Sequence, residues 1–305
     1  MSAPRRGPRG FTLVETLIAM VLLGLVSTVI YKMLITTQRV TDAQAQRGDL
    51  QDNLRSGALV IPNELRQITI STSSSLDTIS DIRAVSDTSI TYRAMRGYYT
   101  ICATPAAATT LTVTNASGFA SEYRAPTTSD SAFVFWEGDT TKTSDDAWVQ
   151  AQILAVSSGT CTYAGATRSA YTFTLLAPLG ATTSFPFTKI QAGSPVRTYE
   201  TVQLSLYTSG GQQWLGMKVG SGTMQPVVGP LAATSGGLYG FQLTYYDSTG
   251  AVLAATSGNV PKMRTIKVAL RGVTSGSVSE SGSGTRVPIN DSLVTYVTLR
   301  NAPFN

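Results

Sequence analysis

The sequence predicts an α+β protein, in which one long N-terminal helix precedes a mainly antiparallel β-rich domain. Apolar residues run almost without interruption from Phe11 to Ile35 and then recur at helical spacing as far as Ile68. After Asp81 the pattern changes to short alternating runs, separated by turns rich in Gly and Ser. Only 13% of residues are charged, which is typical of Thr-rich, β-rich domains outside the cytoplasm.

The composition limits the classes of function. The chain has 305 residues, enough for one or two domains, and no histidine. Catalytic Ser-His-Asp or Cys-His groups and His-containing zinc sites are therefore excluded. The net charge of +5 includes Arg5, Arg6 and Arg9 at the start of the chain, and no basic patch with interleaved aromatics follows. We expect no enzymatic activity, no cofactor and no metal site, and nucleic-acid binding stays unknown.

The first helical segment, residues 11–35, is long enough to cross a membrane. It would span about 37 Å as a helix, against a hydrocarbon core of about 30 Å, and Lys32 can extend to the interface at its far end. A secretory signal peptide is the alternative. However, no small-residue cleavage pattern follows the apolar run. The Glu15 carboxylate would also cost about 2.5–3.5 kcal/mol on membrane insertion. A signal peptide has no use for a carboxylate there.

The stretch "RGFTLVETLIAM" resembles the class III signal of type IV pilins and pseudopilins. It has a basic leader, Gly10, Phe11, an apolar run, and Glu15 at the fifth position after the glycine. The resemblance implies that a prepilin peptidase removes residues 1–10 by cleavage after Gly10, and that the new N-terminus at Phe11 is methylated. It further implies a single-pass inner-membrane protein with its C-terminal domain outside the cytoplasm, which then joins a pilus or pseudopilus at the cell surface.

In such a filament Glu15 has a physical role. Cleavage after Gly10 creates a charged amine on Phe11, close to the apolar phase. When apolar helices pack side by side with an axial stagger, Glu15 of one subunit meets the Phe11 amine of its neighbour. A buried charge is strongly unfavourable unless it is paired, so this pairing would set the register of assembly. The alternative is that Glu15 only anchors the helix in the interfacial region.

The second helical segment, residues 36–70, is amphipathic and should pack its apolar stripe on the sheet. Pro62 should kink the helix or end its regular part near Ile61. The β-rich region, residues 71–305, then contains a series of expected strands: 82–95, 98–102, 110–114, 133–136, 148–156, 171–176, 199–207, 213–219, 238–246, 264–272 and 292–300. The stretch "YYDSTGAVL" predicts a hairpin, "GTMQPVVGP" predicts a turn-rich connection, and residues 274–286 predict a mobile surface loop.

The order of these elements also resembles a narrower group, the PilW-type minor pilins and pseudopilin J of type II secretion. The resemblance rests on "LQDNLRSGALVIPNELRQI" and on the strand pattern from residue 202 onward. Residues 104–195 fit it less well and are expected to be an insertion or a small subdomain. The resemblance implies a minor pilin that joins or primes a type IV filament. The alternatives are a type II secretion pseudopilin and a tip-located protein that binds DNA, a surface or another cell. Expected partners are the prepilin peptidase, other pilins or pseudopilins, and the inner-membrane assembly platform.

Three other groups of residues are weaker candidates. Cys102 and Cys161 form a disulfide or remain two unrelated buried thiols, and export of the domain favours the disulfide. Asp139, Asp145 and Asp146 lack the glycine and distal glutamate of an EF-hand loop, so a solvated loop is favoured over a calcium site. Four aromatic residues offer a glycan- or DNA-stacking surface or, more simply, strand packing: Tyr98, Tyr99, Trp136 and Trp148.

Overall fold

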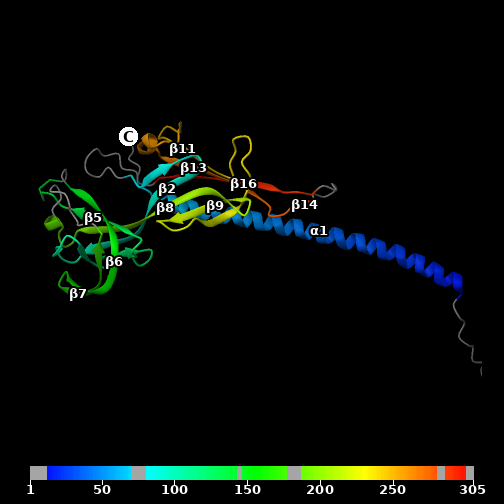
Figure 1. The fold of residues 1–305 in the computed structure, drawn as a ribbon, viewed down its shortest axis with the longest axis horizontal. Helices are drawn as coiled ribbons and strands as arrows, with labels where there is room; N and C mark the ends of the chain where they lie inside the picture. Colours follow the sequence, from blue (N-terminus) through cyan, green and yellow to red (C-terminus); the bar gives the residue numbers. More distant parts are fainter. Residues whose placement is uncertain are drawn as a thin grey trace, which may run out of the picture. The chain divides into compact units, whose positions relative to one another are not determined.

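The computed structural model describes residues 12–69, 80–139, 141–142, 146–176, 187–279 and 286–299. It confirms the α+β class, with one long helix, α1, followed by a large antiparallel sheet (Figure 1). The chain divides into two compact units. One comprises Met1–Gln51 with Thr274–Ile289, and the other comprises Asp52–Val273 with Asn290–Asn305.

Helix α1 covers Leu13–Leu65, which is 53 residues. Thr12 caps its start, because the Thr12 hydroxyl accepts the Glu15 N–H at 3.3 Å and the Thr12 carbonyl accepts the Thr16 N–H at 3.2 Å. The helix does not end near Ile61 but continues past Pro62, whose carbonyl accepts the Arg66 N–H at 2.9 Å. It ends at Leu65, within the turn after the proline and five residues before the expected boundary at residue 70.

The first unit contains, besides the N-terminal part of α1, a short hairpin in the segment predicted as a mobile loop. Strands β14 (Val278–Ser279) and β15 (Arg286–Val287) pair antiparallel. Thr274 closes the base of this hairpin, because its N–H donates to the Ile289 carbonyl and its hydroxyl accepts the Ile289 N–H. Within its described residues, the segment 274–286 therefore has regular structure at both ends.

The second unit is built on a sheet in which every strand pair is antiparallel. The strand order is β1-β2-β3-β7-β6-β5-β8-β9-β10-β13-β11-β12, with β16 paired to β13 and β4 to β2. The strands are β1 (Ile82–Val85), β2 (Ser89–Ile101), β3 (Thr110–Thr114), β4 (Ser121–Glu122), β5 (Ser131–Trp136), β6 (Ala147–Tyr163), β7 (Ala166–Leu175), β8 (Pro195–Ser209), β9 (Gln212–Val219), β10 (Gln225–Leu231), β11 (Phe241–Tyr246), β12 (Val252–Leu253), β13 (Thr265–Val273) and β16 (Asn290–Thr298). Two 3₁₀ turns, Phe187–Lys189 and Ser257–Lys262, connect them.

One additional pairing closes part of this sheet into a small barrel. Strand β2 also pairs with β8, from Ser89↔Ser205 to Thr100↔Pro195, so β2, β3, β7, β6, β5 and β8 form a closed ring of six strands (Figure 1). Its interior is filled by apolar side chains, as expected of a barrel of this size. They include Tyr99, Ile101, Leu111, Val113, Val134, Trp136, Ile153, Phe173 and Val196.

The remaining strands form an open sheet together with β2, which pairs with β1, and β8, which pairs with β9, and this sheet contacts the last part of α1. The two approach closely at Gly57, where an added Cβ would lie 2.7 Å from Val228 Cγ2 and 2.8 Å from Leu270 Cδ1. Leu54, Ile61 and Leu65 of the helix are buried. From Leu54 onward, the apolar stripe expected over residues 36–70 is thus the face that packs on the sheet, whereas Val40, at its start, is 48% exposed.

Most of the expected strands are present, but the expected strand 82–95 is a hairpin of β1 and β2, with β2 running on to Ile101, and β10 was missed. Its segment was interpreted as a turn-rich connection because Pro226 and Pro230 cannot donate to a ladder. The strand accommodates them through shifts of register against β9, between Pro226 and Val228 and between Val228 and Leu231. The predicted hairpin is confirmed by the β11–β12 pairing, and Asp247 Oδ1 accepts the N–H groups of Thr249 and Ala251 in its turn.

Candidate functional site

The N-terminal part of α1 presents apolar side chains that nothing described covers. An 18-residue apolar window of the helix has no buried residue. Leu13, Leu17, Val21, Leu25, Val29 and Leu34 are each more than half exposed. The helix is long and apolar enough to cross a membrane, which supports a membrane-anchored protein. Exposed area of this size in water would be strongly unfavourable, so the segment requires lipid or other apolar helices around it.

The few polar side chains in this segment are mostly satisfied within the helix. The hydroxyls of Thr16, Thr28 and Thr36 donate to the carbonyls of Leu13, Gly24 and Lys32 at 2.8–2.9 Å. Such internal bonds remove the cost of placing a hydroxyl in an apolar phase. The carboxylate is different, because an ionised group needs an oppositely charged partner.

Glu15 supplies that carboxylate, in the first turn of α1. It is the only charged residue from Leu13 to Tyr31. Within the described ranges it forms no ion pair. The positive end of the helix dipole favours a carboxylate at this position, but it does not replace a full counter-charge. Gly10 and Phe11, the expected cleavage and methylation positions, lie outside the described residues.

A network of charged side chains, most of them buried, supports the other end of α1. Arg96 on β2 forms ion pairs with Glu64, in the last turn of the helix, at 3.3 Å and with Glu200 on β8. The second carboxylate oxygen of Glu200 pairs with Arg124 at 2.6 Å, and Arg124 also pairs with Asp130 at 2.6 Å. Each charge in this network faces an opposite one. The network thus fixes the end of the helix to the barrel strands β2 and β8.

Tyr92 strengthens the junction at Glu64. Its hydroxyl donates to Glu64 Oε2 at 3.3 Å. Burial raises the pKa of Tyr92 well above its usual range, so the phenol keeps the proton that it donates. Sequence analysis missed this junction. The only sequence signal was a pair of arginines on a strand that is otherwise buried, Arg93 and Arg96.

The two cysteines lie on the barrel. The structure joins Cys102, directly after β2, to Cys161, near the end of β6, with a Cα–Cα separation of 6.2 Å. The bond ties the tip of the β6–β7 hairpin to the end of β2. Their separation in sequence is 59 residues, so the bond closes a loop that contains the barrel strands β3 and β5 and most of β6.

The other sequence candidates do not come together as a site. Asp139 accepts hydrogen bonds from Thr141 and pairs with Lys142, while Asp145 lies outside the described residues. In the part of the chain that the structure describes, no three Asp, Glu or Cys residues are placed to hold a metal ion. Tyr99 and Trp136 belong to the barrel core. The Arg197 guanidinium lies 4.5 Å from the centre of the Trp148 ring, so that ring is already covered on one side.

Comparison with known proteins gives one match. Residues 5–31 match the family model described as the prokaryotic N-terminal methylation motif. No curated protein and no solved structure matches the chain significantly. The matched segment contains Gly10, Phe11 and Glu15 and most of the exposed apolar helix. Together with the α+β fold, the match supports a protein of the type IV pilin-like class, with a methylation signal and a membrane-anchored N-terminal helix.

Proposed function

We propose that the chain is a minor pilin, a subunit that joins or primes a type IV filament. The observation that carries this proposal is the methylation motif on an uncovered apolar segment of α1, residues 13–31, whose one carboxylate, Glu15, has no described partner. A helix of this kind is stable in the membrane before assembly and among other such helices after it. Prepilin peptidase, other pilins and the assembly platform are the partners that this route requires.

The first test is N-terminal processing. Intact mass and N-terminal sequencing of the membrane-extracted protein should show Phe11 as the first residue, carrying a methyl group. Replacement of Gly10 by a bulky residue should leave residues 1–10 attached and the protein unassembled. A mature chain that begins near residue 35 would instead establish an ordinary signal peptide.

The second test separates a pilus subunit from its alternative, a type II secretion pseudopilin. An epitope-tagged chain should be recovered from sheared surface filaments, together with other pilins. Deletion of its gene should reduce surface filaments and leave protein secretion intact. Loss of secretion with normal filaments would establish the pseudopilin role. The third alternative is a tip-located binding protein, for which the epitope tag should be detected at filament ends only.

A further inference from the structure

One face of the sheet formed by β11, β13 and β16 points away from the buried core. Two cationic side chains lie along this face, both on β13. On β13, Ile266, Val268 and Leu270 are buried, while Lys267 and Arg271 alternate with them and are partly exposed. Ala269 lies between the two cations, with Gln242 of β11 on one side and Val294 of β16 on the other. The two cations are four positions apart along the strand, a distance of about 13 Å.

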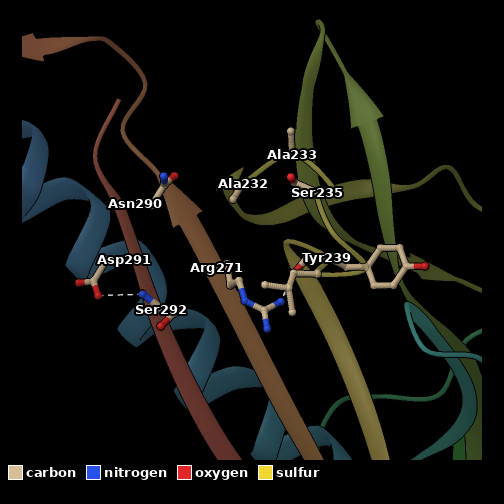
Figure 2. A pocket seen from close by; sticks show the side chains of 9 residues that line it. Ala232, Ala233, Ser235, Tyr239, Arg271, Asn290, Asp291 and Ser292 are labelled. Carbon is tan, nitrogen blue, oxygen red and sulfur yellow. Dashed lines mark hydrogen bonds between the residues drawn. The ribbon is translucent and has the colours of Figure 1, made fainter. Parts of the chain in front are cut away.

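Arg271 lies at the floor of a pocket of about 460 Å³. Figure 2 shows its guanidinium between the loop 232–239 on one side and the start of β16, residues 290–292, on the other. The loop contributes mainly apolar wall, including Leu238, which is 53% exposed. The pocket therefore combines one cation with an apolar surface, which is the usual composition of a site for an anionic group on an otherwise apolar ligand.

The guanidinium is held in place but not neutralised. Its Nη1 donates to the Tyr239 carbonyl at 2.6 Å and to Gln242 Oε1 at 3.2 Å, both uncharged acceptors. Within the described residues Arg271 forms no ion pair. Asp291, which also lines the pocket, is exposed, and its carboxylate accepts the Ser292 N–H at 2.7 Å. An arginine fixed by neutral acceptors is preorganised to bind a carboxylate.

Beyond the pocket, the same face again places a cation beside apolar side chains. Lys267 also forms no described ion pair, and it lies beside Tyr296 of β16. Val294 and Tyr296 are 48% and 58% exposed. The two cations therefore adjoin exposed apolar side chains of the neighbouring strand.

We propose that this face is a docking site for an extended, acidic peptide segment of a partner protein. One Asp or Glu side chain of the segment pairs with Arg271 in the pocket. A second, four residues along, reaches Lys267, and an apolar side chain between them contacts Val294, which is 48% exposed. Residues four apart in an extended chain lie on one face and match the spacing of the two cations. The inference stands on this surface alone and does not depend on the proposed filament role.

A peptide fits better than a polyanion. A nucleic acid or a polyanionic glycan needs a continuous row of cations along its backbone. This face offers two cations separated by Ala269, has Asp291 at its rim, and places Leu238 and Val294 where a phosphate or a sulfate would gain nothing.

The test measures peptide binding to the full chain in detergent micelles by fluorescence anisotropy. The probe is a labelled, acetylated and amidated peptide, Asp-Thr-Leu-Thr-Asp, which carries only side-chain carboxylates. Arg271→Gln should raise its Kd about tenfold and Lys267→Gln about threefold, because each removes a charge-assisted contact. The matched control is Lys218→Gln on β9, which makes the same charge change on another strand and should leave the Kd unchanged.

Three further measurements decide the outcome. Val294→Asp should weaken binding by repelling the peptide, and it keeps the test valid if Arg271→Gln unfolds. The peptide Asn-Thr-Leu-Thr-Asn should bind at least about tenfold more weakly than the acidic probe. The inference is overturned by equal binding of the two peptides, by equal effects of Lys267→Gln and Lys218→Gln, or by no binding of the probe. It is also overturned if a neutral peptide with a free C-terminus, or a single-stranded oligonucleotide, binds more tightly than the probe.

Discussion

Glu15 is the residue on which assembly should depend most. Replacement by alanine removes a polar group from the apolar phase, so membrane insertion should be unchanged or improved. In an assembled filament the neighbouring amine loses its partner, and breaking one side of a buried ion pair costs about 3–5 kcal/mol. We expect Glu15→Ala to reduce recovery in sheared filaments by about tenfold or more, at normal membrane levels. Glu15→Asp should be intermediate, because its shorter side chain reaches less far.

The control for this prediction is Thr28→Ala on the same helix. The Thr28 hydroxyl is satisfied by the Gly24 carbonyl at 2.8 Å, so its loss should leave assembly intact. Normal incorporation of Glu15→Ala would remove the pairing role. One exception fits the mechanism: a subunit at the filament tip has no neighbour above it and would tolerate the change.

Asp81 should make stability depend on pH. Burial raises the pKa of Asp81 to about 6 from its ordinary 3.8, although Arg93 and Arg197 act in the opposite direction. The folded protein therefore holds a proton between about pH 4 and 6 that the unfolded chain releases. The stabilising contribution of Asp81 is full below about pH 4 and is lost as the pH rises through about 6. The charged form at pH 7 costs about 3 kcal/mol relative to the protonated one.

The variant Asp81→Asn isolates this effect. Its amide oxygen can still accept the Thr69 N–H, which Asp81 Oδ2 accepts at 2.7 Å, but it does not titrate. The variant should be more stable than the native protein at pH 7, by up to about 3 kcal/mol, and equally stable near pH 4. Thermal unfolding followed at several pH values tests this. A difference in Tm that stays constant from pH 4 to 7 would contradict it.

At the scale of elements, two glycines of α1 give a matched comparison. An added methyl group at Gly57 meets Val228 and Leu270 at less than 3 Å, whereas at Gly48 it meets nothing within 4 Å. Gly57→Ala should therefore lower the free energy of unfolding by about 1–2 kcal/mol through overpacking. Gly48→Ala should raise it by up to about 1 kcal/mol through helix propensity. Denaturant titration measures both, and effects of the same sign would mean that the helix does not pack at Gly57.

The Cys102–Cys161 bond should stabilise the barrel. Closing a loop with a sequence separation of 59 residues contributes roughly 4 kcal/mol in the chain-entropy model. Non-reducing peptide mapping of the exported protein should recover the linked peptides. The double variant Cys102→Ala, Cys161→Ala should unfold at a lower denaturant concentration by a corresponding amount. Two alkylatable thiols in the native protein would refute the bond.

At the scale of the whole molecule, the barrel and the open sheet should unfold together, because β2 and β8 belong to both. Trp136 lies in the barrel core and Trp214 on β9 of the open sheet. Two variants isolate one fluorescent probe each: one keeps only Trp136 and the other keeps only Trp214, with Phe at the other two tryptophan positions. Their unfolding curves should coincide. Separate midpoints would show that the two parts are independently stable.

The sequence predicted what depends on local pattern. The long helix and most strands follow from apolar periodicity over neighbouring residues, and the β11–β12 turn follows from Asp247. Closure of the barrel does not follow from local pattern, because it depends on the pairing of β2 with β8. This pairing joins residues far apart in the sequence, such as Ser89 and Ser205. The charged junction is equally non-local, since Arg96 and Glu200 lie 104 residues apart. Strand β10 was missed because its prolines oppose a strand locally and are accommodated only by bulges in the pairing with β9.

The sharing of β2 and β8 has a mechanical consequence. A filament subunit is under tension whenever its exposed domain is pulled away from its anchor. Here no flexible linker separates the barrel from the sheet that holds the helix, because the same two strands run through both without a break. A pull along these strands loads their ladder in shear, so many hydrogen bonds resist together instead of opening one at a time. Glu64 and Arg96 add a cross-link at the point where helix and strand meet. Within this unit, force should therefore pass from the barrel to the last turns of α1 with little stretching before the strands separate.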